Sequence, residues 1–253
     1  MLQSLLQIVR DAGAKMLSYD HPEVYQKEGH ANFVTQADIE VQAFLMDKLH
    51  VALPQAMFFA EEQENAALTG EWTFVIDPID GTTNFMRERK WSSISVALLK
   101  DKEPVIGIVL NPYSGELFHG EQKKGAFLNG TPIHVSKTAF DQALVGFGTS
   151  PYQPSLASRS MCAAEKFLLQ AGDLRRSGSA ALDLCDIACG RSDIFWEYVL
   201  SPWDFAAGAL LVTEAGGKTG CPGSGPLAFD RKMAVLAANP KCFLQAEKLL
   251  ADE

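Results

Sequence analysis

The sequence predicts a mixed α/β protein in two halves, an antiparallel-sheet half over residues 1–140 and a smaller α/β half over residues 141–253. Between residues 92 and 135, apolar strand-like runs alternate with turn signals such as Asn129-Gly130, which is the pattern of an antiparallel meander. From residue 143 onward, strand and helix patterns alternate instead, which is typical of α/β architecture. No flexible linker stands near residue 140, so we expect two packed halves and not two free domains.

In the first half, two helices flank a polar segment. Apolar residues between positions 2 and 17 recur at helical spacing, and Thr35 with Asp38 forms a capping-box-like pair that opens a helix running to about residue 53. The segment 20–34 between these helices has the composition of a loop or a weak hairpin. Strands are predicted at 57–60, 72–77, 92–99, 104–110, 116–119, 125–128 and 132–135.

In the second half, the expected helices begin at capping residues. Gly178-Ser179 is a helix start with a capping serine, and Pro202 suits the first turn of another helix. Helices are expected near 155–171, from 179, from 202 and over 240–250. Strands are predicted between and around them, at 143–148, 173–177, 194–199 and 233–238.

The composition excludes some classes of function. The chain has 253 residues, of which 47% are hydrophobic, and its net charge of −9 argues against a nucleic-acid or membrane surface. Five cysteines in no framework spacing indicate a reducing compartment, and we interpret Cys185 and Cys189 as two buried thiols instead of a metal pair. Neither a signal peptide nor a membrane span is visible, so we expect a cytoplasmic protein.

The segment 74–85 carries the clearest indication of chemistry. A buried strand ends at Asp77, where Pro78 is expected to stop further pairing, and a turn at Asp80-Gly81 then leads into a short helix. Carboxylates at a strand end suit a hard cation, and N–H groups at a helix start suit a phosphate, so together they suit a metal-assisted phosphoryl reaction. The alternative is a strand-to-helix turn in which Asp77 or Asp80 is only an N-cap.

This segment resembles the signature of the inositol monophosphatase family, within a larger group of Mg²⁺-dependent, Li⁺-sensitive sugar-phosphate phosphatases. A second signature of the family follows at 203–208 and 214–217, and the similarity extends from about Lys27 to the last strand. The resemblance implies a layered αβαβα sandwich, a homodimer and two or three Mg²⁺ ions per site. It also implies hydrolysis of myo-inositol 1-phosphate to inositol and phosphate by metal-activated water.

The resemblance further implies roles for single residues. The metal ligands would be Glu61, Asp77, the carbonyl of Ile79, Asp80 and Asp204. The residues that orient or activate the attacking water would be Glu61, Thr82, Asp38 and Glu62. The phosphate would be held by the N–H groups of Gly81 and Thr82, and the alcohol would be faced by Asp80, Ala180, Glu197 and Asp204. Lys27 matches a lysine that reaches the metal cluster through water.

Ordinary structural roles compete with some of these assignments. Asp38 and Asp204 also suit helix capping, and Glu61-Glu62 can be read as a solvated strand end. Glu197 stands inside an apolar strand, where a charged residue needs a partner or water. Capping and substrate contact can both hold for the backbone around Ser179-Ala180.

Several rival chemistries lack their motifs. A P-loop ending at Lys218-Thr219 would need glycine where Val212 stands, and neither a phospho-aspartate signature nor a G-x-S-x-G elbow occurs. Two other functions stay open. One is a sister phosphatase acting on histidinol phosphate, fructose 1,6-bisphosphate, NADP or adenosine bisphosphate, and the other is a non-enzymatic scaffold that binds a protein partner.

Overall fold

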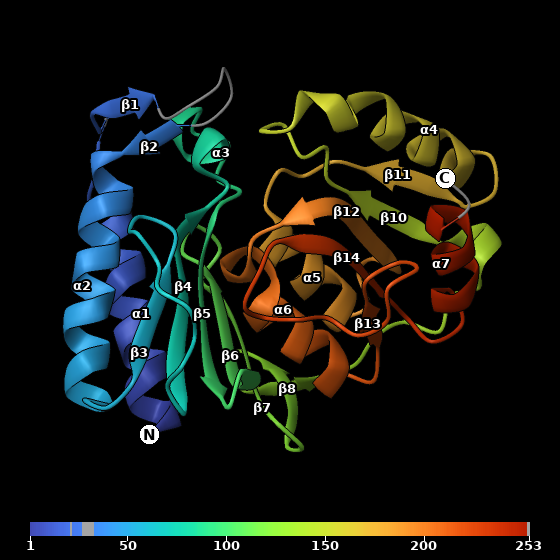
Figure 1. The fold of residues 1–253 in the computed structure, drawn as a ribbon. Coiled ribbons are helices and arrows are strands. Elements are labelled where there is room, and N and C mark those ends of the chain that lie inside the picture. The colour runs from blue at the N-terminus through green and yellow to red at the C-terminus, as the bar shows by residue number, and fades with distance from the viewer. Residues whose placement is uncertain (21, 27–32, 252–253) are drawn as a thin grey trace.

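The computed structural model describes residues 1–20, 22–26 and 33–251. Its elements stack in five layers, in the order helices, sheet, helices, sheet, helices (Figure 1), which confirms the predicted αβαβα sandwich. The first helical layer holds α1 (Leu2–Leu17) and α2 (Gln36–Ala52). The middle layer holds α5 (Ala180–Ala188) and α6 (Pro202–Glu214), and the last holds α4 (Ala157–Leu168) and α7 (Phe243–Ala251).

The larger sheet of the described residues has seven strands in the order β3-β4-β5-β6-β7-β8-β9. Only its first pair, β3 with β4, is parallel, and the other neighbours are antiparallel as a meander requires. The strands are β3 (Met57–Ala60), β4 (Trp72–Asp80), β5 (Ser93–Lys100), β6 (Glu103–Asn111), β7 (Glu116–Glu121), β8 (Gly125–Leu128) and β9 (Thr131–Ile133).

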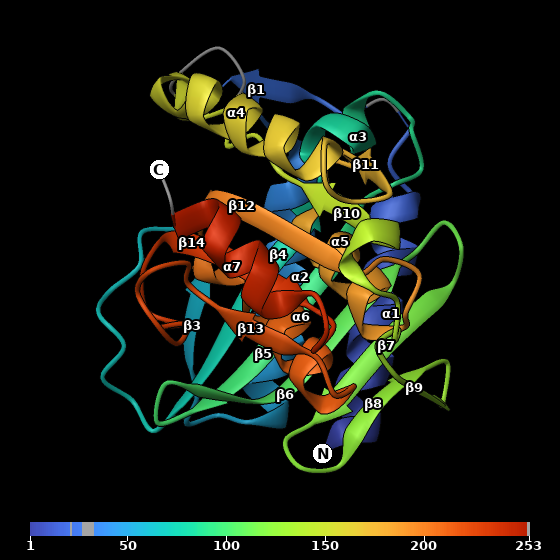
Figure 2. The ribbon, with the colours of Figure 1, turned by 90° about the vertical axis from the view of Figure 1, so that its right-hand side faces the viewer.

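The second sheet of the described residues has five strands in the order β11-β10-β12-β14-β13. β10 is parallel to both of its neighbours, whereas β14 is antiparallel to β12 and β13. The strands are β10 (Leu144–Phe147), β11 (Asp173–Arg175), β12 (Ile194–Leu200), β13 (Lys218–Gly220) and β14 (Met233–Ala238), of which β13 had not been predicted. Figure 2 shows α4 and α7 in front of this sheet.

Alternation along the strands divides the apolar residues among three cores. In β4, Phe74 and Ile76 face α1 and α2, whereas Val75 faces α5 and α6. In β12, Phe195 faces the middle helices and Trp196 faces α4 and α7. The middle helices therefore pack against both sheets, and the division of the chain into two domains near residue 140 stays a prediction.

The remaining elements are short. β1 (Val24–Gln26) and β2 (Phe33–Thr35) pair antiparallel, which agrees with a weak hairpin, and α3 (Thr82–Met86) follows β4. Two 3₁₀ turns, η1 (Phe140–Gln142) and η2 (Pro154–Leu156), flank β10. Within the described ranges, no helix is both long enough and apolar enough to span a membrane.

The prediction that Pro78 ends its strand is wrong. β4 continues to Asp80, and its pairing with β5 shifts register between Asp77, opposite Ser95, and Asp80, opposite Ser93. A bulge accommodates a proline because the inserted residue needs no ladder hydrogen bond. The N–H of Ile79 also turns away from the ladder and donates to Asp77 Oδ1 at 3.0 Å. The bulge therefore shapes the strand end on which both aspartates stand.

Candidate metal centre

Three aspartates from two distant segments meet at the end of β4. Asp77, Asp80 and Asp204 each offer a carboxylate oxygen, and these atoms all lie within 4.8 Å of one another. Asp77 and Asp80 flank the bulge, whereas Asp204 lies in the first turn of α6 and accepts a hydrogen bond on Oδ2 from the N–H of Ser201 at 2.6 Å. The capping role and the cluster role of Asp204 thus occur together.

Asp80 is held by the beginning of α5. Its Oδ2 accepts hydrogen bonds from the Ser179 hydroxyl, from the N–H of Ala181 at 2.9 Å and from Ser93 Oγ at 3.4 Å. A carboxylate at a helix N-terminus also interacts favourably with the helix dipole. Asp80 therefore ties the end of β4 to α5 in the middle helical layer.

The cluster concentrates negative charge in the interior. Burial raises the pKa of Asp77 well above its usual range, and the neighbouring charges of Glu61, Asp80 and Asp204 raise it further. Burial and then the charge of Glu61 likewise raise the pKa of Asp204. Burial raises the pKa of Asp80 to about 6, although its hydrogen bonds from Ser179 and Ala181 oppose the shift.

A second carboxylate group approaches the cluster from β3. Glu61 follows this strand, its N–H donates to the carbonyl of Ile76 at 3.2 Å, and its charge raises the pKa values of Asp77 and Asp204. The N–H of Glu62 donates to Gln42 Oε1 at 2.8 Å, and Glu62 contributes to the raised pKa of Asp38. Glu61 therefore lies close enough to act on Asp77 and Asp204, although it is not one of the three residues whose carboxylate oxygens meet within 4.8 Å, and Glu62 acts on Asp38.

Thr82 connects the cluster to α2. Its hydroxyl lies 3.2 Å from Asp38 Oδ1 and 3.2 Å from the carbonyl oxygen of Ile79. Asp38 is fully buried and completes the predicted capping box, because its Oδ2 accepts from the N–H of Thr35 at 2.7 Å. Burial raises the pKa of Asp38 to about 6.

Gly81 permits a close approach of three segments. Its φ is 85°, and a Cβ at this position would lie 3.0 Å from the carbonyl oxygen of Gly178 and 3.2 Å from that of Trp91. An L-residue would be strained by the backbone conformation and crowded by both carbonyls. The glycine therefore allows the N-terminus of α3 to lie beside the loop before α5.

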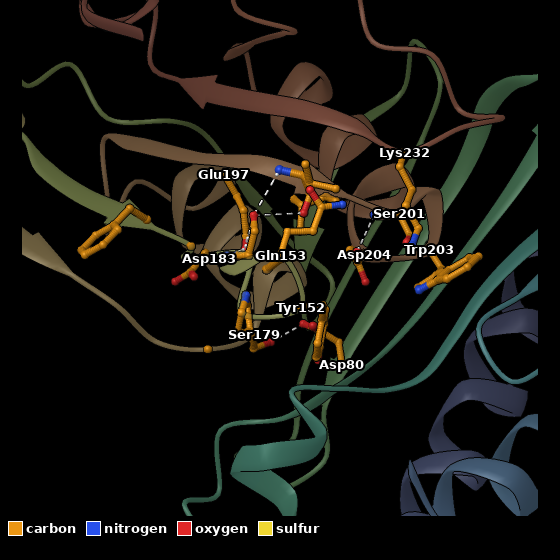
Figure 3. Close-up of a pocket in the computed structure, with 18 of the residues that line it drawn as sticks. Asp80, Tyr152, Gln153, Ser179, Asp183, Glu197, Ser201, Trp203, Asp204 and Lys232 are labelled. Atoms are coloured by element: carbon orange, nitrogen blue, oxygen red, sulfur yellow. Dashed lines mark hydrogen bonds between the residues drawn. The ribbon is translucent and has the colours of Figure 1, made fainter. Parts of the chain in front are cut away.

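A cavity of about 310 Å³ opens over the cluster (Figure 3). Its lining includes Glu61, Asp80, Asp204, Ala180 and Glu197, so predicted metal ligands and predicted alcohol contacts face one space. Figure 3 shows Asp80, Tyr152 and Ser179 on one side of it, and Asp204, Trp203 and Lys232 on another. Its volume is at the small end of the range for ligand pockets, which suits a ligand of sugar size.

Glu197 has a partner that the sequence did not reveal. This residue of β12 is 9% exposed, and its Oε1 accepts from the N–H of Ser150 at 2.7 Å and from Ser150 Oγ at 3.3 Å. Burial raises the pKa of Glu197 to about 7, while these bonds and the charge of Arg176 oppose the rise. Glu197 both lines the cavity and holds the segment that follows β10.

Sequence reasoning missed the cavity residues outside the two signatures. Arg176, Lys232, Tyr152 and Ser150 line the cavity, but they come from three separate loops, Ser150 and Tyr152 sharing one of them, and their meeting depends on the tertiary fold. The predicted contact at Lys27 lies outside the described residues.

The donor set fits a divalent cation. Buried carboxylates that raise each other's pKa values need a positive counter-charge, and oxygen donors are the ligands that Mg²⁺ and similar hard cations take. The carbonyl of Ile79 stands at the same bulge. We conclude that the aspartate cluster can bind metal.

Comparisons with known proteins show what the chain is similar to. The model of the inositol monophosphatase family matches residues 1–251. An inositol-1-monophosphatase of Synechocystis is 35% identical over 99% of this chain and 90% of its own length. A putative Nus factor SuhB of Neisseria meningitidis is 35% identical over 87% of this chain and 85% of its own length. The structure of the extragenic suppressor protein suhB from Bartonella henselae superposes with a TM-score of 0.91 and 31% identity, and the match covers 98% of this chain and 97% of that one.

Proposed function

Because the chain belongs to the inositol monophosphatase family, a family of phosphatases, we propose that it is a Mg²⁺-dependent enzyme that hydrolyses myo-inositol 1-phosphate to inositol and phosphate. The observation that carries this proposal is that two aspartates of the cluster, Asp80 and Asp204, line one cavity together with Ala180 and Glu197. Water is the proposed nucleophile.

The carboxylate cluster is the proposed metal site. Glu61, Asp77, Asp80, Asp204 and the carbonyl of Ile79 would hold two or three Mg²⁺ ions. When bound, such ions lower the pKa of a water and offset the charge that develops on the phosphate and on the leaving oxygen. The hydrogen bonds from Ser179 and Ala181 keep the carboxylate of Asp80, one of these ligands, from rotating.

The groups around Thr82 would orient the water and the phosphate. The Thr82 hydroxyl, fixed between Asp38 and Ile79, is available to a water on the cluster, and Glu61 and Glu62 supply further acceptors nearby. The N–H groups of Gly81 and Thr82 would donate to the phosphate oxygens at the start of α3.

At the other end of the cavity, the alcohol would meet hydrogen-bonding groups. Glu197 would accept from a hydroxyl of the polyol, and Ala180, Asp80 and Asp204 would border the ring. We expect replacement of Glu197 with glutamine to lower kcat/KM for inositol 1-phosphate about tenfold, because one charge-assisted hydrogen bond is weakened. Hydrolysis of p-nitrophenyl phosphate, which has no hydroxyl to bind, should change much less.

A phosphate-release assay tests the proposal and this variant together. The wild-type protein should hydrolyse inositol 1-phosphate in the presence of Mg²⁺. EDTA should abolish this hydrolysis, and so, given the resemblance, should added Li⁺. Glu121→Gln, a substitution outside the cavity, is the control. Folded, metal-loaded protein that releases phosphate from no ester would contradict the proposed function, whereas turnover of a different ester would replace only the substrate.

One observation favours a second candidate, a phosphatase for esters that carry another anionic group. Arg176 and Lys232 line the cavity, whereas their sequence neighbours Arg175 and Arg231 pair with Asp173 at 2.5 Å and Asp230 at 3.5 Å and do not line it. Two cations beside a phosphate site would attract a second phosphate, as in fructose 1,6-bisphosphate.

For this candidate, Arg176→Gln or Lys232→Gln should raise KM for fructose 1,6-bisphosphate about tenfold, because a charged hydrogen bond is lost. KM for inositol 1-phosphate should stay within about twofold, since a monophosphate has no second anion to lose contact. Arg175→Gln and Arg231→Gln are matched controls, one position away from each. Equal increases in KM for both substrates would show that Arg176 and Lys232 do not bind a second anionic group.

A further inference from the structure

Tyr152 stands in a turn that the structure fixes firmly. The N–H of Gln153 donates to the carbonyl of Ser150 at 2.8 Å, which closes a four-residue turn with Pro151 in its second position and Tyr152 in its third. Serine at the first position and proline at the second are typical of such turns. The local sequence therefore specifies the direction in which Tyr152 leaves the backbone.

Glu197 anchors the start of this turn. Ser150 is 4% exposed and has a φ of 42°, a conformation that L-residues seldom adopt. It is kept there by the bonds to Glu197 and by the N–H of Val199, which donates to Ser150 Oγ at 3.2 Å. Gly148 makes room, because a Cβ there would overlap the Glu197 carboxylate.

The anchored turn places Tyr152 in the lining of the cavity that Asp80 and Asp204 also line. Tyr152 is 62% exposed, and it lines the cavity beside Asp80 and Ser179 (Figure 3). Burial of the hydroxyl, followed by the charges of Glu61, Asp204, Asp77 and Asp80, raises its pKa. The phenol is therefore protonated at neutral pH and offers a hydrogen-bond donor to an anion.

We propose that Tyr152 is a further substrate-binding residue, whose hydroxyl donates a hydrogen bond to the phosphate of an ester held at the aspartate cluster. The inference rests on the proposed phosphatase function and adds to it a side-chain donor from the loop after β10. Glu197 then acts twice, as an alcohol contact and as the positioning residue for Tyr152 through Ser150.

The test compares Tyr152→Phe with Tyr113→Phe, a tyrosine that does not line the cavity. Loss of the hydroxyl should raise KM for inositol 1-phosphate about tenfold and weaken competitive inhibition by inorganic phosphate by a similar factor, with kcat nearly unchanged. Inorganic phosphate reports binding without turnover. Tyr113→Phe should change neither constant.

A double-mutant cycle separates positioning from general damage. In a Glu197→Ala background the turn loses its anchor, so Tyr152→Phe should then cost less than about threefold. In a Glu197→Gln background, whose amide oxygen can still accept from Ser150, the tenfold effect should remain. If the wild type is active but Tyr152→Phe changes neither KM nor inhibition by phosphate, this inference alone is overturned. If the wild type is inactive, the proposed function and the inference are overturned together.

Discussion

Asp77→Asn is expected to lower kcat/KM for inositol 1-phosphate by more than about 100-fold while the protein remains folded. The reason for the loss is that an amide replaces a charged ligand at the centre of the cluster, and even outer partners of metal ligands commonly contribute 10–100-fold. The protein should remain folded because burial and neighbouring charges raise the pKa of Asp77, which means that they disfavour its charged form, and asparagine carries no charge.

The sign of the stability effect follows from that raised pKa. The native state binds the Asp77 proton more tightly than the unfolded chain, so the contribution of Asp77 to stability falls as pH rises above its unfolded pKa. At neutral pH, which is above the unfolded pKa, Asp77 therefore makes metal-free protein less stable than it is at low pH, and asparagine, which does not titrate, removes that penalty. In EDTA, the variant should melt at the wild-type temperature or above it.

Mg²⁺ titrations followed by thermal melting complete the comparison. Mg²⁺ should raise the melting temperature of the wild type by mass action, and should raise that of Asp77→Asn much less. Asp47→Asn, at an exposed site on α2, is the control and should behave as the wild type. Turnover of Asp77→Asn within a few-fold of the wild type would remove Asp77 from the metal site.

Gly107→Ala is expected to destabilise the protein by about 1–3 kcal/mol, the usual cost of overpacking a core. A Cβ on Gly107, in β6, would lie 2.7 Å from the carbonyl oxygen of Ala207 and 3.2 Å from its Cα. Both atoms belong to the backbone of α6, so no side-chain rotation relieves the contact. The helix must move away from the sheet, and Asp204 stands in its first turn.

Thermal melting and activity measure the two parts of this effect. For a protein of this size the expected loss is about 2–4 °C per kcal/mol. Gly146→Ala, in β10, is the matched strand control, because its Cβ would make only ordinary contacts at 3.4 Å or more. Equal melting temperatures for the two variants would show that α6 is not seated against Gly107 as described.

Features set by neighbouring residues were predictable from the sequence. The capping box of Thr35 and Asp38 is local, and hydrophobic spacing shows which residues face the core. The layered sandwich followed from the family signatures, whereas the strand beyond Pro78 was missed because a bulge depends on the partner strand.

The missed part of the site depends on long-range contacts. Ser150 meets Glu197 across 47 positions of sequence, and Ser179 meets Asp80 across 99. Composition and periodicity carry no information about such pairs. Arg176, Lys232 and Tyr152 are polar loop residues in the sequence, and only the fold brings them to one cavity.

The sharing of α5 and α6 between two sheets has a consequence during synthesis. The last strand of the first sheet ends at residue 133, but α6 begins only at residue 202. At translation rates of about 5–20 residues per second, those intervening residues take about 3–14 seconds to emerge. Until then the chain lacks α6, the longer of the two helices that pack on Val75, Val109 and Phe118, so part of this apolar face of the sheet stays exposed to ribosome-associated chaperones.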